Sequence, residues 1–233
     1  GAMIVSLGEE EAASILAERE DIEVGCEFCG VQYRFDAIDA AQLFKDLETL
    51  SAGDMEGRLT GTPGAAKARA YIQRRFKEAG LQPIGDSYER PFTYRGRGDS
   101  GDRSGVNIVG VVRGTREPGR FIVVTAHFDH LGVRNGEIFN GANDNASGVA
   151  ALLAVASRVS ASRPAHSVVF AALDAEESGL HGARAFLADP PVPREAIVMN
   201  VNLDMVGRDA KNVLFASGTF HYPFLKAYLK DVA

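Results

Sequence analysis

The fold of this chain is decided by the stretch Phe121-Ile122-Val123-Val124-Thr125-Ala126-His127-Phe128-Asp129-His130. Its first five residues form a strongly apolar run, which is typical of a buried strand in a parallel sheet. A histidine and a carboxylate, His127 and Asp129, follow at the end of that strand, where open α/β sheets bind their ligands. A His-x-Asp tripeptide alone is a weak signal, because most such pairs are ordinary polar surface residues. The prediction of a metal site therefore depends on the segments downstream.

Three later segments carry carboxylates at the ends of predicted elements. One precedes an apolar helix predicted over residues 149–159, whose positive end favours a negative charge. Two follow apolar strands predicted at 167–173 and 196–203. The carboxylates of these segments are Asp144, Glu176 with Glu177, and Asp204. A plain cap or a solvated turn would explain each segment alone.

All of these segments fall on one expected edge of a parallel sheet, so separate explanations for each become unconvincing. Imidazole and carboxylate groups are the ligands of zinc or a similar divalent ion, and a bridging carboxylate lets two ions lie close together. Further strands are predicted at 88–94 and 106–112, and helices at 37–50 and 63–79, the latter capped by Thr62. Together these elements predict an α/β fold with a mostly parallel central sheet and helices on both faces.

Composition narrows the class of protein. The chain has 233 residues, 45% of them hydrophobic, and a net charge of −6. This length suits one α/β domain with a small appendage. The charge argues against nucleic acid as a partner, and no apolar run is long enough to span a membrane. Residues 1–3 resemble a cloning remnant, and no signal peptide follows them.

The two cysteines, Cys26 and Cys29, lie in a predicted tight turn that precedes an alternating strand at 31–35. A Cys-x-x-Cys turn presents two thiolates to one tetrahedral metal, but a structural zinc site needs four ligands. Two reduced thiols or a strained local disulfide are the alternatives. A short helix is predicted at 9–18. The segment is therefore expected to be a small zinc-knuckle-like α+β appendage.

The residues around this cysteine pair, in the runs 7–11, 22–30 and 33–36, resemble the C-terminal zinc switch of the redox-regulated heat-shock holdase chaperone family. In that family two cysteine pairs share one zinc ion, and oxidation releases it. Only the second pair is present here, as Cys26 and Cys29. The resemblance covers about residues 4–44 and does not include the chaperone body, so it does not imply chaperone activity.

The rest of the chain, from about residue 45 to 233, is similar to the co-catalytic di-zinc aminopeptidases of the bacterial leucyl aminopeptidase and aminopeptidase Y type. Four motifs occur in the order of that family. They are His-Phe-Asp-His-Leu-Gly (127–132), Gly-Ala-Asn-Asp-Asn-Ala-Ser-Gly (141–148), Asp-Ala-Glu-Glu-Ser-Gly-Leu-His-Gly (174–182) and Asn-Leu-Asp-Met-Val-Gly-Arg (202–208). The resemblance implies a zinc exopeptidase-like fold that hydrolyses the N-terminal residue from peptides.

The resemblance also implies which residues bind metal. Asp144 would bridge the two zinc ions, His127 and Asp204 would complete the protein ligands of one ion, and Glu177 would bind the other. In the family the second ion also takes a histidine from a late loop, and no matching motif occurs in this chain. His221 does not match that motif. The remaining histidines, His130, His166 and His181, have no ligand motif of their own.

Two further residues receive catalytic roles from the resemblance. Asp129 would hold the His127 ring as a partner behind the metal. Glu176 would be the general base, which takes a proton from the attacking water and passes it to the leaving amine. Because one histidine ligand and the late loops are not matched, we expect a C-terminally truncated domain whose peptidase activity is weak or lost.

These observations predict a chimera with a cloning remnant (1–3), a chaperone-derived segment (4–44) and an aminopeptidase-like domain (45–233). Its expected cofactor is zinc, one or two ions at the peptidase-like site and one at the cysteine pair. The alternative is a non-catalytic fusion module that oligomerises. Two copies would then associate through an uncovered sheet edge, exchange elements, or pool their Cys26 and Cys29 thiolates around one zinc ion.

Overall fold

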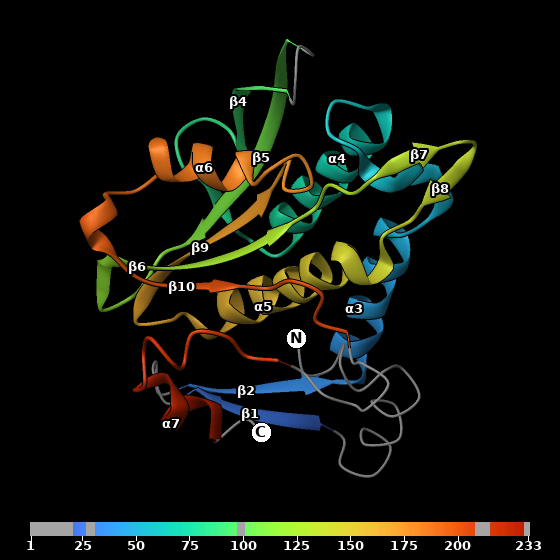
Figure 1. Ribbon diagram of the computed structural model, residues 1–233. Coiled ribbons are helices and arrows are strands. Elements are labelled where there is room, and N and C mark those ends of the chain that lie inside the picture. Colours follow the sequence, from blue (N-terminus) through green and yellow to red (C-terminus); the bar gives the residue numbers. More distant parts are fainter. Residues whose placement is uncertain (1–20, 27–30, 97–100, 208–214, 231–233) are drawn as a thin grey trace.

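A computed structural model describes residues 21–26, 31–96, 101–207 and 215–230 of the chain (Figure 1). Its centre is a six-stranded sheet in the order β10-β6-β9-β5-β3, with β4 also paired to β5. The strands are β3 (Gln82–Pro83), β4 (Glu89–Arg95), β5 (Asp102–Val112), β6 (Glu117–His127), β9 (His166–Leu173) and β10 (Ile197–Asn202). The α/β fold predicted from the sequence is confirmed.

The sheet is mixed, whereas the sequence predicted mostly parallel pairing. Strand β6 runs parallel to both β9 and β10, but β5 is antiparallel to β9, β4 and β3. The reason is the short connection 113–116 between β5 and β6, which turns the chain back without a crossover helix. The parallel half of the sheet carries the strand ends that matter for the site.

Helices cover both faces of this sheet, as predicted. Helices α4 (Pro63–Glu78) and α5 (Gly148–Ser162) pack on one face, and α3 (Ala37–Leu50) packs against α5. The shorter α6 (His181–Ala188) covers the other face (Figure 1). Alternate residues of β6 enter the two opposite cores, Val124 one and Val123 the other. Burial on both faces explains the continuous apolar run of this strand.

Helix α4 begins where the sequence predicted. The Thr62 hydroxyl accepts a 3.3 Å hydrogen bond from the Ala65 amide, and Pro63 occupies the first helical position. Gly80, with φ of +78°, follows the end of the helix. The segment between α3 and α4 contains the short 3-10 helix η1 (Gly53–Arg58).

The N-terminal part contains an antiparallel pair, β1 (Asp21–Cys26) and β2 (Val31–Asp36), followed directly by α3. The strand predicted at 31–35 is therefore confirmed, whereas the helix predicted at 9–18 lies outside the described residues. The remaining elements are β7 (Gly132–Arg134), β8 (Glu137–Phe139), the single-turn η2 (Ala142–Ser147), η3 (Arg194–Ala196) and α7 (Leu225–Lys230). No helix within the described ranges is both long and apolar enough to cross a membrane.

Candidate metal and catalytic site

His127, the last residue of β6, forms the centre of the site. It is 4% exposed, and its Nδ1 atom lies 3.1 Å from the main-chain oxygen of Asp129. That contact turns Nε2 toward two carboxylates, at 3.3 Å from Asp144 Oδ1 and 3.5 Å from Asp204 Oδ1. The parallel pairing of β10 with β6 brings Asp204 beside His127. Three predicted ligands thus meet at one strand end.

Asn145 joins the segments that carry the two carboxylates. Its side-chain amide donates to the Leu203 carbonyl at 2.9 Å, and its Oδ1 atom accepts from the Met205 amide at 3.1 Å. Asn145 follows Asp144 directly, while the other two residues flank Asp204. The sequence predicts no role for this buried residue. Its hydrogen bonds fix the spacing of the two carboxylates.

A second group of donors lies beside the first and shares Asp144 with it. His130 Nδ1 lies 2.6 Å from Glu177 Oε1 and 3.9 Å from Asp144 Oδ2. The donor atoms of these three residues lie within 4.8 Å of one another, as do those of His127, Asp144 and Asp204. Asp144 therefore directs one carboxylate oxygen toward each group. The predicted position of Asp144 between two sites agrees with this geometry.

Asp129 holds the turn that carries the two glutamates. Its carboxylate accepts hydrogen bonds from the main-chain amides of Glu176 at 2.9 Å and Glu177 at 3.2 Å. The same carboxylate lies 3.7 Å from His127 Nδ1, so the main-chain oxygen of Asp129 lies closer to this nitrogen than the carboxylate does. The sequence assigned Asp129 to the histidine ring alone, and the structure adds this second contact.

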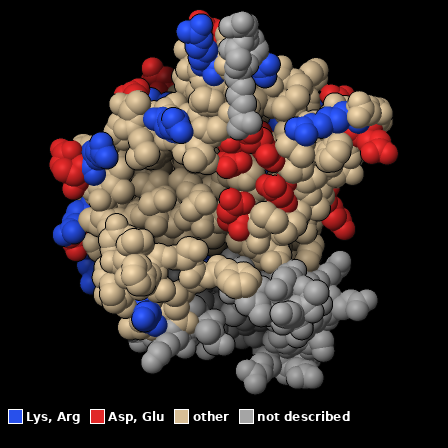
Figure 2. Space-filling view, in the orientation of Figure 1, with Lys and Arg blue, Asp and Glu red and all other residues tan. Residues whose placement is uncertain are grey.

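The donors fit a divalent ion such as zinc. Ligand atoms placed tetrahedrally about 2.0–2.2 Å from zinc lie roughly 3.3–3.6 Å apart. The distances from His127 Nε2 to the two carboxylates are 3.3 and 3.5 Å. Figure 2 shows acidic side chains gathered on this face beside a hollow lined by uncharged ones. Clustered carboxylates repel one another unless a cation compensates their charge.

The carboxylates change the protonation of their neighbours. Burial alone would lower the pKa of His127, but the carboxylates of Asp129 and Asp204 raise it to about 10. Its contact with His127 lowers the pKa of Asp204. Burial raises the pKa of Glu176; the charge of His127 opposes this rise, and the charges of Asp129, Glu177 and Asp204 add to it. The shifts show strong electrostatic coupling at this strand end.

Two hollows adjoin the site. The larger, of about 310 Å³, reaches His127, Glu176 and Asp204. Its apolar wall is formed by Leu173, Leu180, Ala183, Phe186, Leu187 and Ile197.

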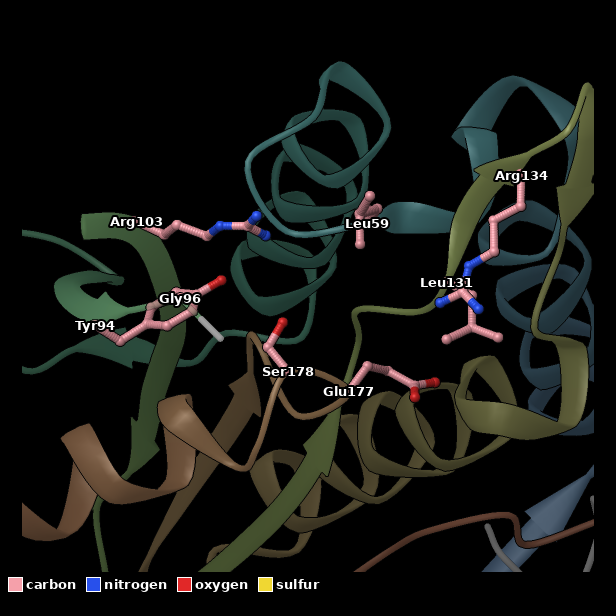
Figure 3. Close-up of a pocket in the computed structure, with 8 residues that line it drawn as sticks. All are labelled: Leu59, Tyr94, Gly96, Arg103, Leu131, Arg134, Glu177 and Ser178. Atoms are coloured by element: carbon pink, nitrogen blue, oxygen red, sulfur yellow. The ribbon is translucent and has the colours of Figure 1, made fainter. Parts of the chain in front are cut away.

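The other hollow, of about 250 Å³, adjoins Glu177 and Ser178. Figure 3 shows the side chains of Arg103, from β5, and Arg134, from β7, reaching toward it from opposite sides. One side of the site is therefore apolar and the other carries two guanidinium groups.

Arg58 supports the main chain around the site, and no motif in the sequence marks it. Its fully buried guanidinium donates to the carbonyls of Phe128 at 2.7 Å, Asn140 at 2.7 Å and Gly141 at 2.9 Å, and also to the Leu50 carbonyl. Burial lowers its pKa to about 10. This residue ties the strand end at His127 to the segment before Asp144.

The other residues singled out in the sequence lie elsewhere or outside the described residues. His166 begins β9, with its Nε2 atom 3.6 Å from Glu117, and His181 stacks on Tyr94. His221 is exposed beside Phe220. Cys29 lies outside the described residues, and only the backbone of Cys26 is described, in β1. The zinc site at the cysteine pair stays a prediction.

Comparisons with known proteins divide the chain in two. The model of peptidase family M28 matches residues 107–233, which is more than half of the chain. The model of the Hsp33 protein family matches residues 1–36. The predicted two-part chimera, with peptidase and chaperone segments, is confirmed.

Individual relatives agree with this division. A 33 kDa chaperonin of Methylobacillus flagellatus is 54% identical over 44 residues, which are 19% of this chain and 15% of the relative. A probable zinc metalloprotease of Leptosphaeria maculans is 34% identical over 162 residues, which are 67% of this chain and 31% of the relative. The chain thus spans less than a third of either relative.

Solved structures share the fold. A leucine aminopeptidase precursor of Bacteroides thetaiotaomicron is similar with a TM-score of 0.58 and 21% identity, over 73% of this chain and 63% of that one. A glutaminyl cyclase of Porphyromonas gingivalis gives a TM-score of 0.62 and 19% identity, over 72% and 62% of the two chains. At these identities the likeness establishes the fold and leaves the reaction open.

Proposed function

The chain belongs to peptidase family M28, and from this premise we propose that residues 45–233 form a zinc-dependent hydrolase that removes the N-terminal residue of peptides. The observation that carries the proposal is the meeting of His127 Nε2 with the carboxylates of Asp144 and Asp204 at distances that suit zinc. Named relatives include probable zinc metalloproteases. Fold, donor set and relatives therefore support the same class of chemistry.

The residues present would hold zinc without rearrangement of the fold. His127, Asp144 and Asp204 would bind one ion, and Asp144 with Glu177 would contribute to a second. Zinc, when bound, polarises a substrate carbonyl and makes water nucleophilic at neutral pH. The three carboxylates offset the charge of the ions.

Glu176 would act as the general base. Its pKa is raised toward neutral pH, and a group whose pKa lies near the working pH can both accept a proton and return it readily. Glu176 lines the larger hollow together with His127 and Asp204, so it faces the space a substrate would enter. It would take a proton from the attacking water and deliver it to the leaving amine.

The two hollows suggest how a peptide would lie. A positively charged N-terminus is repelled by Arg103 and Arg134 and attracted by the carboxylates, so the N-terminal residue belongs on the apolar side. The larger hollow would take an apolar N-terminal side chain. The following residue would then lie toward the two arginines, which favour a carboxylate there.

Slow turnover follows from the openness of the site. The side chains of Asp144 and Asp204 are 37% and 43% exposed. Water that reaches these groups weakens the electrostatic stabilisation of a transition state. We therefore propose hydrolysis at a low rate.

The proposal is tested by measuring whether hydrolysis depends on zinc and whether it requires a free N-terminal amine on the substrate. The protein would be stripped with a chelator, reloaded with zinc, and assayed on leucine p-nitroanilide and on its N-acetylated form. We expect activity to disappear on stripping, to return with zinc, and to be confined to the free amine. Equal hydrolysis of the acetylated compound would contradict an aminopeptidase.

Because solved glutaminyl cyclases share the fold, a cyclase reaction is the nearest rival chemistry. A peptide that begins with glutamine separates the two, since hydrolysis releases free glutamine and cyclisation retains the residue as a pyroglutamyl group. The hydrated site favours attack by water, so we expect release. Mass spectrometry that finds loss of ammonia with the peptide chain intact would support the cyclase instead.

A non-catalytic module that assembles with a second copy is the other candidate function. Among the described strands, β10 pairs on one side only, with β6. Exposed aromatic side chains follow it in the chain: Phe215, Phe220, Tyr222 and Phe224. Native mass spectrometry tests this candidate, with Phe220→Ser and Phe224→Ser as variants and Tyr88→Phe as a control away from that segment. A protein that is already a monomer without any substitution would contradict the assembly of two copies.

Zinc shared between the cysteine pairs of two chains belongs to the same candidate. Under this hypothesis the Cys26→Ser and Cys29→Ser double variant loses half a zinc ion per chain and dissociates. A dimer that persists with its zinc content unchanged would contradict the shared site.

A further inference from the structure

His130 is the histidine of the second donor group, which it forms with Asp144 and Glu177. All five histidines of the chain fall within the described residues, and His166, His181 and His221 take no part in either donor group. His130 is the one beside Glu177 and Asp144, although no ligand motif marked it.

The His130 ring is held in place by packing. Its side chain is 10% exposed, and Nδ1 lies 2.6 Å from Glu177 Oε1. Behind it, Gly141 adopts φ of +59°, and a Cβ atom there would lie 2.5 Å from Cδ2 of the ring. A side chain at Gly141 would therefore displace His130. The close approach of glycine keeps Nδ1 directed at the carboxylates.

The two oxygens of Asp144 divide between the two histidines. Oδ1 lies 3.3 Å from His127 Nε2, and Oδ2 lies 3.9 Å from His130 Nδ1. One carboxylate with an imidazole on either side is the donor arrangement of a bridged pair of zinc ions. Each ion would then have one imidazole and, besides Asp144, one further carboxylate, Asp204 or Glu177.

We propose that His130 is a zinc ligand, and that through Nδ1 it completes the second site with Glu177 and Asp144. The inference rests on the proposed zinc site but not on hydrolysis. It predicts two zinc ions per chain at the peptidase-like site, one in each donor group. It also predicts that His130 matters for only one of the two ions.

Zinc stoichiometry tests this assignment directly. A Cys26→Ser, Cys29→Ser background removes any zinc at the cysteine pair, and elemental analysis follows equilibrium dialysis against buffered zinc. We expect two ions per chain in the background, about one after His130→Ala, and two after His221→Ala, the matched control. Equal zinc in the His130→Ala and His221→Ala proteins would overturn the inference.

The outcomes also separate this inference from the proposed function. Zinc that depends on His127 but not on His130 would overturn the inference alone. A background protein that holds no zinc would overturn both.

A spectroscopic measurement keeps the test independent of folding defects in the variants. The background protein would be labelled with ¹⁵N-histidine and loaded with ¹¹³Cd. We expect a one-bond coupling between ¹¹³Cd and Nδ1 of His130, assigned by its loss in His130→Gln, while the signals of His181 and His221 stay uncoupled. Two bound cadmium ions without coupling to His130 would overturn the inference.

Discussion

The carboxylate of Asp129 accepts a 2.9 Å hydrogen bond from the main-chain amide of Glu176. An acceptor buried behind the site thus positions the proposed base. Asp129→Asn replaces one accepting oxygen by an NH₂ group. This group would face a main-chain N–H of Glu176 or Glu177, and two donors cannot form a hydrogen bond, so the turn that carries the two glutamates should shift. We expect kcat to fall about tenfold to a hundredfold. Leucine anilide kinetics measure the change, with the exposed Asp86→Asn as control; unchanged kcat in Asp129→Asn would contradict this role.

Arg58 should be among the most sensitive positions for stability. Methionine at this position fills part of the space but leaves buried carbonyls, including those of Phe128 and Gly141, without donors. We expect the free energy of unfolding to fall by about 3 kcal/mol or more. Urea unfolding measures the loss. The stability of Arg58→Lys should lie between those of the unchanged protein and Arg58→Met, because lysine keeps the charge but reaches fewer carbonyls. Equal losses in the two variants would contradict this role of the guanidinium.

Zinc affinity should rise with pH well beyond neutrality. The pKa of His127 without metal is raised to about 10, so the imidazole is protonated at pH 7 and must lose that proton to bind. Affinity should increase about tenfold per pH unit between pH 7 and 9. Competition titrations against a chelator, corrected for the protonation of the chelator, measure this slope. A curve that levels off above pH 7 would show an ordinary histidine pKa.

The paired arginines should favour an acidic second residue. Leu-Glu-amide and Leu-Gln-amide differ only in that charge, so we expect a KM about twofold to fivefold lower for the first, as for an exposed ion pair. The difference should vanish in Arg103→Ser, Arg134→Ser protein and persist in the exposed control Arg116→Ser. The KM of each dipeptide amide is measured by chromatography of the released leucine. A difference that survives the double substitution would place the second residue elsewhere.

Much of the fold was predictable because its signals are local. The apolar run of β6 is buried on both faces, and Thr62 with Pro63 marks the start of α4. Open α/β sheets bind ligands at the carboxyl ends of their parallel strands, and this rule predicted that His127, Asp144 and Asp204 lie close together, as they do in the structure. These predictions needed only periodicity, caps and the direction of parallel strands.

The remaining features depend on contacts between distant segments. Arg58 binds main-chain carbonyls, which every residue has, so nothing in the sequence marks its partners. The placement of β9 between β5 and β6 is likewise a tertiary feature that no local pattern marks. The proximity of His130 to Glu177 appears only when the ends of β6 and β9 lie side by side.

The most direct measurement of the central claim compares the unchanged protein with Glu176→Gln on leucine p-nitroanilide, at equal and measured zinc content. Glutamine keeps the size of the side chain but cannot accept a proton, so we predict a loss of about a hundredfold or more in kcat. Zinc content should be unchanged, because Glu176 belongs to neither donor group. Equal turnover of the two proteins, or no turnover by zinc-loaded unchanged protein, would contradict a hydrolase that uses Glu176 as its base.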